Sequence, residues 1–85
     1  MNIKIRTSRE HWKDLQYALF NVLNMRWVNS NTADITDKWS PYLIVDLELK
    51  TVVMIYDSEI FAKYEGSEMT DLEFFGFEEA GIQQT

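Results

Sequence analysis

The sequence contains no cysteine, a single histidine, one proline and three glycines in 85 residues. Without cysteine the chain forms no disulfide, has no thiolate nucleophile and offers no sulfur ligand for zinc. The single histidine, His11, excludes most histidine-based metal centres. No glycine-rich phosphate-binding loop is present, because Gly66, Gly76 and Gly81 are scattered. These absences leave few routes to catalysis, and we expect no catalytic residues, no cofactor and no metal site.

Long apolar runs are missing as well. No segment approaches the roughly 20 apolar residues that a membrane-spanning helix requires. The first residues include Lys4 and Arg6 and lack the apolar stretch of a signal peptide. We therefore expect a soluble, cytoplasmic protein. The composition, 46% hydrophobic and 26% charged, is that of a globular chain, and its length fits a single domain over residues 1–85.

Charge is distributed unevenly along the chain, which carries a formal net charge of -6. Residues 1–28 hold five basic and two acidic side chains, whereas residues 57–85 hold eight acidic and one basic. The negative total disfavours direct binding of nucleic acid, whose phosphates repel acidic side chains. We therefore divide the domain into a core over residues 1–56 and an acidic, phenylalanine-rich segment over residues 57–85.

The first part of the sequence predicts a strand followed by an amphipathic helix. Residues 2–6 alternate between isoleucine and basic residues, the pattern of a strand with one buried face. Thr7 and Glu10 form a capping box at the start of the helix expected over about 8–24. Its apolar stripe has helical spacing and stops before Asn24, the predicted end. The stripe consists of Trp12, Leu15, Ala18, Leu19, Val22 and Leu23.

Three more strands are expected, at 25–28, 42–48 and 51–56, the last two joined as a hairpin near Leu49 and Lys50. The order β-α-β-β-β predicts an α+β fold, with a small, mainly antiparallel sheet and the helix packed on one face. Alternation along the hairpin separates a core face from an outer face. The residues predicted to meet the helix are Leu43, Val45, Leu47, Leu49, Val52, Met54 and Tyr56.

The outer face of the sheet is expected to carry charged and apolar side chains together. Lys4 and Arg6 would lie opposite Asp46 and Glu48, as cross-strand ion pairs on a hydrated surface. Three branched apolar residues on the same face require cover. One interpretation is a homodimer about a two-fold axis; the other is that residues 69–77 fold back over this face. The predicted self-association residues are Ile44, Val53 and Ile55.

The polar residues form no recognisable catalytic or metal-binding motif. No serine lies in the strained turn that a nucleophile uses, so we interpret His11 as a partly buried helix residue. Asp46 and Glu48, two residues apart on a strand, are interpreted as a hydrated pair with basic neighbours. Residues 29–34 supply oxygen ligands but lack the central glycine of a calcium loop. We expect a protein that is not an enzyme.

A nucleic-acid surface is the alternative for the basic first third. Phe20 lies on the predicted helix near Arg9 and Lys13, outside the apolar stripe, and aromatic groups beside basic ones hold single strands. Five basic residues in a chain of net charge -6 make a weak signal for this function. We therefore interpret these residues as a solvated helix face.

The acidic end of the chain suggests a protein-binding surface. Carboxylates spread over a rigid surface imitate the phosphates of nucleic acid and fit a basic groove on another protein. Phenylalanines among them supply the apolar anchors that dominate interface energies, although at least one of the three is expected in the core. Residues 69–77 fit either a strand or a short helix. The predicted partner-binding residues are Glu65, Glu68, Asp71, Glu73, Phe74, Phe75, Phe77, Glu78 and Glu79.

Four segments together resemble a known class of protein: residues 3–6, 15–20, 25–27 and 41–46. Their arrangement over residues 2–56 is similar to that of small accessory proteins of tailed bacteriophages. The acidic end departs from the pattern. The resemblance implies binding to a host protein, which is inhibited or redirected, with nucleases and other defence factors among the targets. It implies no role for particular residues.

The residues and the resemblance together predict a non-enzymatic protein-binding module. Its expected role is inhibition of a basic host protein that handles nucleic acid, in the cytoplasm of the host cell. The expected partner is therefore a protein, with neither nucleic acid nor a membrane bound directly. The alternative is a structural or assembly protein that acts as a homo-oligomer.

Overall fold

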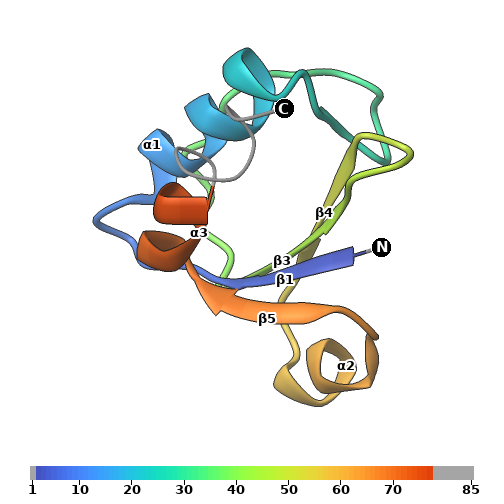
Figure 1. Cartoon of the computed structure of the whole chain (residues 1–85). Helices are drawn as coiled ribbons and strands as arrows, with labels where there is room; N and C mark the ends of the chain where they lie inside the picture. Colours follow the sequence, from blue (N-terminus) through green and yellow to red (C-terminus); the bar gives the residue numbers. More distant parts are fainter. Residues whose placement is uncertain (1, 78–85) are drawn as a thin grey trace.

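The computed structural model describes residues 2–77 and shows an α+β fold built on a five-stranded sheet (Figure 1). The predicted class is therefore confirmed. The elements in chain order are β1 (Asn2–Arg6), α1 (Trp12–Tyr17), the π-helix η1 (Ala18–Val22), β2 (Arg26–Trp27), β3 (Tyr42–Asp46), β4 (Thr51–Ile55), α2 (Ser58–Lys63), β5 (Ser67–Thr70) and α3 (Asp71–Phe77).

The sheet has the strand order β2-β4-β3-β1-β5 and is mixed. Its centre is antiparallel, because β3 pairs antiparallel with both β1 and β4, and Ile44 lies between Lys4 and Val53. The outer strands β5 and β2 instead run parallel to β1 and β4. A parallel neighbour must be reached by a crossover, and α2 supplies the crossover from β4 to β5.

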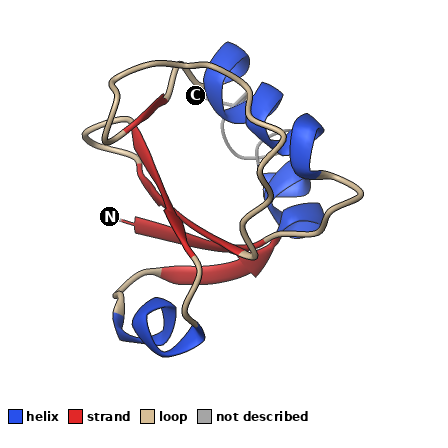
Figure 2. Ribbon diagram, turned by 180° about the vertical axis from the view of Figure 1, so that it is seen from behind, coloured by secondary structure: helices blue, strands red, loops and turns tan. Residues whose placement is uncertain are grey.

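The helices divide between the two faces of the sheet, as Figures 1 and 2 show from opposite sides. α1, η1 and α3 cover one face, and α2 lies on the other. The main core fills the space between the sheet and the first group of helices, and it includes most of the predicted strand and helix residues. The exceptions are Val22, Leu49 and Tyr56, which are exposed, Tyr56 because β4 ends at Ile55. Its fully buried members are Ile5, Leu15, Leu19, Leu43, Val45, Val52 and Phe74.

The first helix begins later than the capping box predicts. The Thr7 hydroxyl donates to the Ser40 carbonyl, so it does not cap the helix. The residue before the helix is His11, whose side chain makes no capping bond, and Ser8 Oγ accepts from the backbone N–H of His11 at 3.4 Å. The helix then runs from Trp12, and it ends before Asn24, which has the predicted stop conformation with φ of 59°.

The second half of this helix is a π-turn, which rotates the apolar stripe. Leu23 N–H donates to the carbonyl of Ala18, five residues back, at 3.1 Å. The wider turn carries Val22 outward, where it is 55% exposed, although the α-helical spacing predicts it in the core. Phe20, predicted outside the stripe, is buried and packs edge-on against Trp27 with ring centroids 4.9 Å apart.

The hairpin turn is longer than predicted because β3 ends at Asp46. Asp46 Oδ1 accepts from the backbone N–H groups of Glu48 and Leu49, and Lys50 closes the turn with φ of 57°. Glu48 and Leu49 therefore lie in the turn and not on the strand. Asp46 and Glu48 do not form the predicted strand pair, and Leu49 is 73% exposed instead of facing the helix.

The segment after β4 forms regular structure throughout the described residues. Asp57 caps α2 by accepting from the N–H of Glu59, and β5 and α3 follow directly on one another. Residues 69–77 therefore include the end of a strand and a helix, and they lie at the edge of the sheet and on its helix-covered face. None of the helices in residues 2–77 is long and apolar enough to cross a membrane.

Candidate interaction surface

Several of the predicted acidic and aromatic partner-binding residues make their contacts within the protein itself. Phe74 is fully buried in the core, and Asp71 is only 5% exposed. Glu73 accepts from the N–H of Thr70 while Thr70 Oγ1 accepts from the N–H of Glu73, a reciprocal capping box at the start of α3. Phe74 and Asp71 are therefore structural residues and not partner-binding ones, whereas Glu73 caps α3 and stays exposed.

Glu68 neutralises the two basic residues of β1. Its carboxylate accepts from Arg6 Nε at 2.6 Å and lies 3.9 Å from Lys4 Nζ. Lys4 is 5% exposed, and its ammonium lies 4.8 Å from the ring centroid of Phe61 on α2. The predicted pairing of Lys4 and Arg6 with Asp46 is therefore wrong, because β5 enters the sheet beside β1 and brings Glu68 to them.

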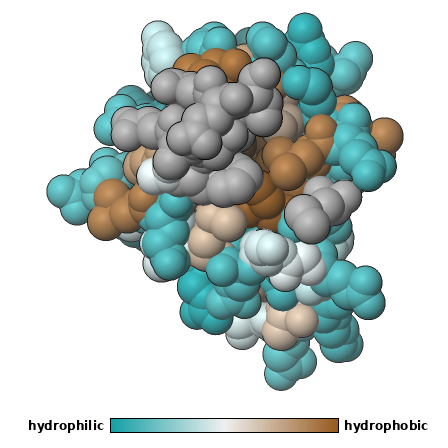
Figure 3. Space-filling model, in the orientation of Figure 1, coloured by the Kyte–Doolittle hydropathy of each residue, from teal (hydrophilic) through white to brown (hydrophobic). Residues whose placement is uncertain are grey.

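The remaining predicted partner-binding residues differ in their exposure to solvent. Glu65 is exposed after α2, and Phe75 is half-buried with its ring edge-on to His11 at a centroid distance of 6.2 Å. The side chain of Phe77 and residues Glu78 and Glu79 lie outside the described part of the chain. Figure 3 shows the α2 end of the molecule as mostly hydrophilic, which agrees with the exposed acidic residues there.

The predicted self-association face is half covered by α2. Phe61 is 2% exposed and stacks on Tyr42 of β3 with ring centroids 4.4 Å apart. Ile44 is buried, at 4% exposed, whereas Val53 and Ile55 remain half-buried. The predicted cover by residues 69–77 is wrong, since α2 lies on this face and residues 69–77 do not, whereas the homodimer stays a prediction. The half of the face beside β2 stays open.

Two adjoining hollows mark this open half, and we call them together the edge groove. The first hollow has a volume of about 280 Å³ and lies at the free edge of β4, against Trp27, Met54 and Tyr56. The second hollow, of similar volume, lies on the open face against Ile44, Leu49 and Tyr64. Val28 and Val53 line both hollows, so the two form one continuous depression.

Large apolar side chains on the edge groove are exposed to solvent. Leu49 is 73% exposed, Tyr56 52%, Val28 49% and Tyr64 38%. They come from the β3–β4 turn, the end of β4, the end of β2 and the end of α2. Leu49 and Tyr64 line the second hollow, Tyr56 lines the first, and Val28 lines both. A contiguous set of this kind is typical of an interaction site, whereas single exposed apolar residues are ordinary.

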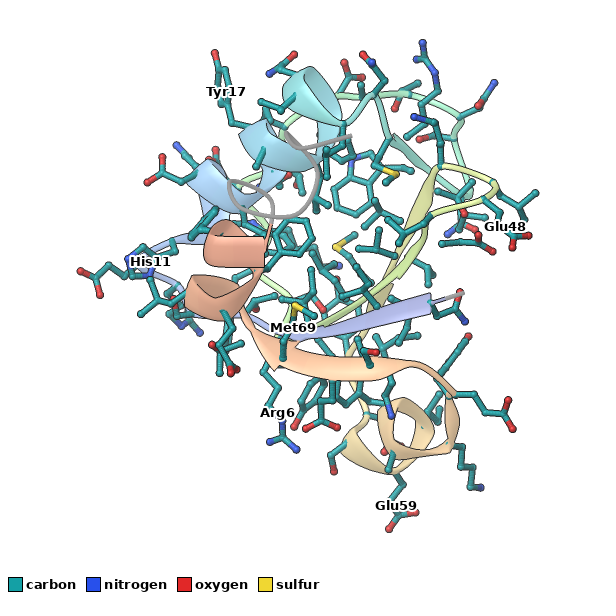
Figure 4. All side chains as sticks on the ribbon, in the orientation of Figure 1. Arg6, His11, Tyr17, Glu48, Glu59 and Met69 are labelled. Atoms are coloured by element: carbon teal, nitrogen blue, oxygen red, sulfur yellow. The ribbon has the colours of Figure 1, made fainter. Side chains whose placement is uncertain are left out.

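Acidic side chains lie at the end of the edge groove that is nearest the β3–β4 turn. Asp46 lines the second hollow, and Glu48 follows in the turn. Figure 4 shows Glu48 at the outer tip of this turn. Glu65 follows Tyr64 directly at the other wall of the hollow. A ligand in this part of the groove therefore meets negative charge.

The edge groove also has basic side chains near it, from Lys50, Lys38 and Arg26. Lys50 turns its Nζ to the carbonyl of Leu23, 3.4 Å away on the helix side of the sheet. Lys38 lies at the end of β4, with Nζ 5.7 Å from the ring centroid of Tyr56. Arg26 is exposed on β2. Because Arg26 pairs with Thr51 in the lining of the second hollow, acidic and basic side chains both lie near the turn, and Lys38 lies beyond Tyr56.

The structure also brings together a serine, a histidine and an aspartate, which the sequence analysis did not anticipate. Ser8 Oγ donates to Asp71 Oδ2 at 2.6 Å and lies 3.0 Å from His11 Nδ1. In a hydrolase triad the imidazole stands between the hydroxyl and the carboxylate, with one nitrogen for each. Here the hydroxyl stands in the middle and gives its only proton to the carboxylate, so no base activates it.

This serine cluster instead fastens the β1–α1 connection to α3. Asp71 Oδ2 also accepts from the backbone N–H of Ser8 at 2.9 Å, and Asp71 Oδ1 accepts from the N–H of Leu72 at 2.8 Å. The carboxylate thereby accepts three hydrogen bonds from donors inside the protein. Residues 2–77 contain no group of three or more His, Asp or Glu side chains placed to hold a metal ion.

The structure does not support the nucleic-acid alternative for the basic residues. Phe20 is buried, and its predicted neighbours are engaged elsewhere: the Arg9 guanidinium lies 4.4 Å from the ring centroid of Trp39, and Lys13 pairs with Asp37 at 2.9 Å. These basic groups therefore do not flank an exposed aromatic platform on the helix.

The sequence signalled only part of the edge groove. Val53 was identified because it alternates with core residues on a clear strand. Val28, Leu49 and Tyr64 were missed. Val28 was assigned to a strand, Leu49 to the core face of the hairpin, and Tyr64 to a segment of undefined structure. Their exposure depends on where the strands end, which the hydrophobic pattern does not determine. Comparisons of the chain with models of protein families, with curated proteins and with solved structures find no match.

Proposed function

We propose that this chain is a non-enzymatic protein-binding module that takes a basic partner in the edge groove. The observation that carries the proposal is the set of four exposed apolar side chains around one continuous depression, with Asp46 in its lining. Apolar anchors surrounded by charge are the usual composition of a protein interface, in which the anchors supply affinity and the charges supply specificity and rate.

A basic partner is favoured by the charge of both the site and the whole chain. Asp46, Glu48 and Glu65 lie at one end of the groove, and the chain carries a net charge of -6. Such a field accelerates the approach of a positively charged protein and slows that of a second copy. Proteins that handle nucleic acid present basic surfaces of the required kind, and the resemblance to phage accessory proteins points to such a host protein as the target of inhibition.

Binding is favoured over catalysis by the state of the polar groups. The Ser8 hydroxyl and the Asp71 carboxylate are committed to each other and to backbone groups. Asp46 uses its Oδ1 to hold the hairpin turn. The edge groove is lined mainly by apolar side chains and contains no histidine, so it supplies contact area and not an acid–base pair.

A capture experiment with two matched variants tests the proposed surface. Val28→Lys places a cation in the edge groove, whereas Val22→Lys places the same cation on η1, and the two valines are 49% and 55% exposed in the native chain. We expect the wild type and Val22→Lys to capture the same protein from a bacterial lysate, and Val28→Lys to lose it. Raising the salt concentration should release the partner.

Equal capture by all three proteins would contradict the proposal that the edge groove is the binding surface. Retention of the partner at high salt would contradict its basic character, because screening weakens exposed charge pairs. Circular dichroism of both variants is the control for folding, and equal spectra are expected because both substitutions lie on exposed positions.

A further inference from the structure

The outer edge of β4 is only partly paired. β2 lies beside Thr51 and Val52, and no strand lies beside the stretch from Val53 to Ile55 on this side in residues 2–77. The reason is local, because the chain turns away directly after Trp27: Asn31 N–H donates to the Trp27 carbonyl at 2.9 Å, and Asn31 has φ of 56°. A place for a short strand is therefore left at this edge.

The backbone of Met54 is directed to this unpaired edge. The Val52 carbonyl accepts from the N–H of Val28 at 3.0 Å, so Val52 presents its polar backbone groups to the outer side. Backbone polar groups alternate along a strand, and Met54 therefore presents its N–H and C=O to the same side. These two groups are a donor and an acceptor at the correct spacing for one further strand.

The first hollow of the edge groove lies at the same position. It is lined by Val53, whose side chain is on the open face, and by Val52 and Met54, whose side chains are on the opposite face. A depression that contacts both faces of a strand lies on the edge itself. Trp27, Thr36 and Tyr56 form its outer wall, so a side chain from an added strand has an apolar pocket beside it.

We propose that an extended segment of the basic partner adds to the sheet at this edge of β4, pairs with the Met54 backbone and inserts an apolar side chain into the first hollow. Strand addition of this kind obtains affinity from main-chain hydrogen bonds and specificity from side-chain pockets. The proposal rests on the proposed protein-binding function and specifies its mode. β2 occupies the edge beside Thr51 and Val52, so a lysine or arginine of the segment would reach Asp46 by passing over Val28, which lines both hollows.

A foreign segment fits this edge better than a second copy of the chain. The four residues that follow β2 are already held in a turn, and two copies would bring together two molecules of net charge -6. A basic segment instead meets Asp46 and Glu48 at one end of the groove.

Selection from short-peptide libraries tests the mode of binding. Two libraries carry lysine at the first or at the last position with a random centre, and a third carries glutamate at those positions as the control. The selected peptide is then methylated on one backbone nitrogen at a time. We expect methylation to weaken binding about tenfold at alternate residues only, because only alternate N–H groups of an added strand bond to β4.

The protein side of the complex supplies the second measurement. Hydrogen exchange of the Met54 amide should slow when the selected peptide binds. Val28→Lys should weaken the peptide at least about tenfold, the effect of roughly 1.4 kcal/mol, while Val22→Lys should leave its affinity unchanged.

Each other result overturns the inference in a distinguishable way. If methylation changes the affinity equally at every residue of the peptide, or at none, strand addition is rejected. If Val28→Lys still weakens the peptide in that case, the edge groove remains the binding surface. Binding unaffected by Val28→Lys would reject the groove and with it the proposed function. Enrichment from the glutamate library alone would reject a basic segment. Self-association of the protein that the peptide reverses would identify a second copy as the occupant.

Discussion

Gly66 is the residue whose identity the fold constrains most directly. It joins α2 to β5 with φ of 148°, and a Cβ at this position would lie 2.3 Å from the backbone oxygen of Asn2. The Asn2 backbone cannot move aside without disturbing β1. Both the positive φ of residue 66 and the lack of room for a Cβ therefore require glycine. Gly76, in α3, has no heavy atom within 4 Å of the corresponding position.

The two glycines therefore respond oppositely to the same substitution. Gly66→Ala is expected to destabilise the protein by about 1–3 kcal/mol, because the residue occupies a region of φ reserved for glycine and meets the Asn2 carbonyl. Gly76→Ala is expected to stabilise it by about 0.5–1 kcal/mol, since alanine favours the helix. Urea denaturation of both variants measures the two changes, and a stable Gly66→Ala would show that the α2–β5 connection is not as described.

Asp71 provides a second comparison at the scale of one side chain. Asp71→Ala leaves the N–H and the hydroxyl of Ser8 without their acceptor in a largely buried place, which is expected to cost about 1–3 kcal/mol. Asp37→Ala removes a carboxylate whose side chain is 87% exposed and is expected to change stability by less than about 0.5 kcal/mol. Thermal unfolding followed by circular dichroism compares the two. Equal losses would contradict the structural role of Asp71.

At the scale of elements, the π-turn explains how one helix contacts both the main core and the edge strand β2. Leu19, Phe20 and Leu23 all reach the core from a stretch in which regular α-helical spacing would bury Val22 instead. Phe20 is thereby brought against Trp27 at the edge strand β2. The turn therefore connects the helix to the strand beside the edge groove, and it shapes the wall that Trp27 contributes.

The rotated stripe makes a prediction about two neighbouring apolar residues. Leu19→Ala is expected to cost about 2–5 kcal/mol, because it leaves a cavity at a fully buried position. Val22→Ala is expected to change stability by less than about 0.5 kcal/mol, since the side chain is exposed. Denaturant titration of both variants provides the measurement. A loss for Val22→Ala as large as that for Leu19→Ala would indicate regular α-helical spacing, in which both side chains are buried.

The C-terminal elements show why a charged segment need not be a surface for a partner. Glu68 enters the sheet on β5 and meets Lys4 and Arg6, and Phe61 on α2 covers Tyr42. The acidic composition of residues 57–85 thus complements the basic strand β1 within the same molecule. Part of the charge asymmetry along the sequence is explained by this internal pairing.

At the scale of the whole molecule, the same pairing weakens the case for a homodimer. The self-complementary arrangement expected for the outer face required free cations at Lys4 and Arg6, and both are occupied by Glu68. α2 also removes Ile44 from the predicted patch. The part of the face that remains open carries acidic groups at the β3–β4 turn, and a second copy presents the same charge.

We therefore expect a monomer in solution. Sedimentation equilibrium at high micromolar concentration and physiological salt should give the mass of a single chain, 10.1 kDa. Val53→Lys should leave this mass unchanged, because the residue is predicted to contact a partner and not a second copy. A dimer that Val53→Lys dissociates would instead support the homo-oligomeric alternative and assign the edge groove to self-association.

Much of the fold follows from the sequence alone. Alternation in residues 2–6 and in the hairpin determined which side chains enter the core, because a strand buries every second residue on one face. The α+β class, the hairpin and the stop at Asn24 were predicted from the same local patterns. These features depend on residues close to one another in the chain, and periodicity reports them directly.

Other features were decided only by tertiary structure. The pairing of β5 with β1 and the Ser8–Asp71 contact join residues more than 60 positions apart. The crossover helix α2 lies on a face of the sheet that no local pattern specifies. The edge groove belongs to this group. Val28, Leu49 and Tyr64 meet there because β2 stops after two residues, the hairpin turns early and α2 covers only half of the sheet. Where strands end and which face a helix covers are set by the packing of the whole chain, and so the binding surface could be located only in the folded molecule.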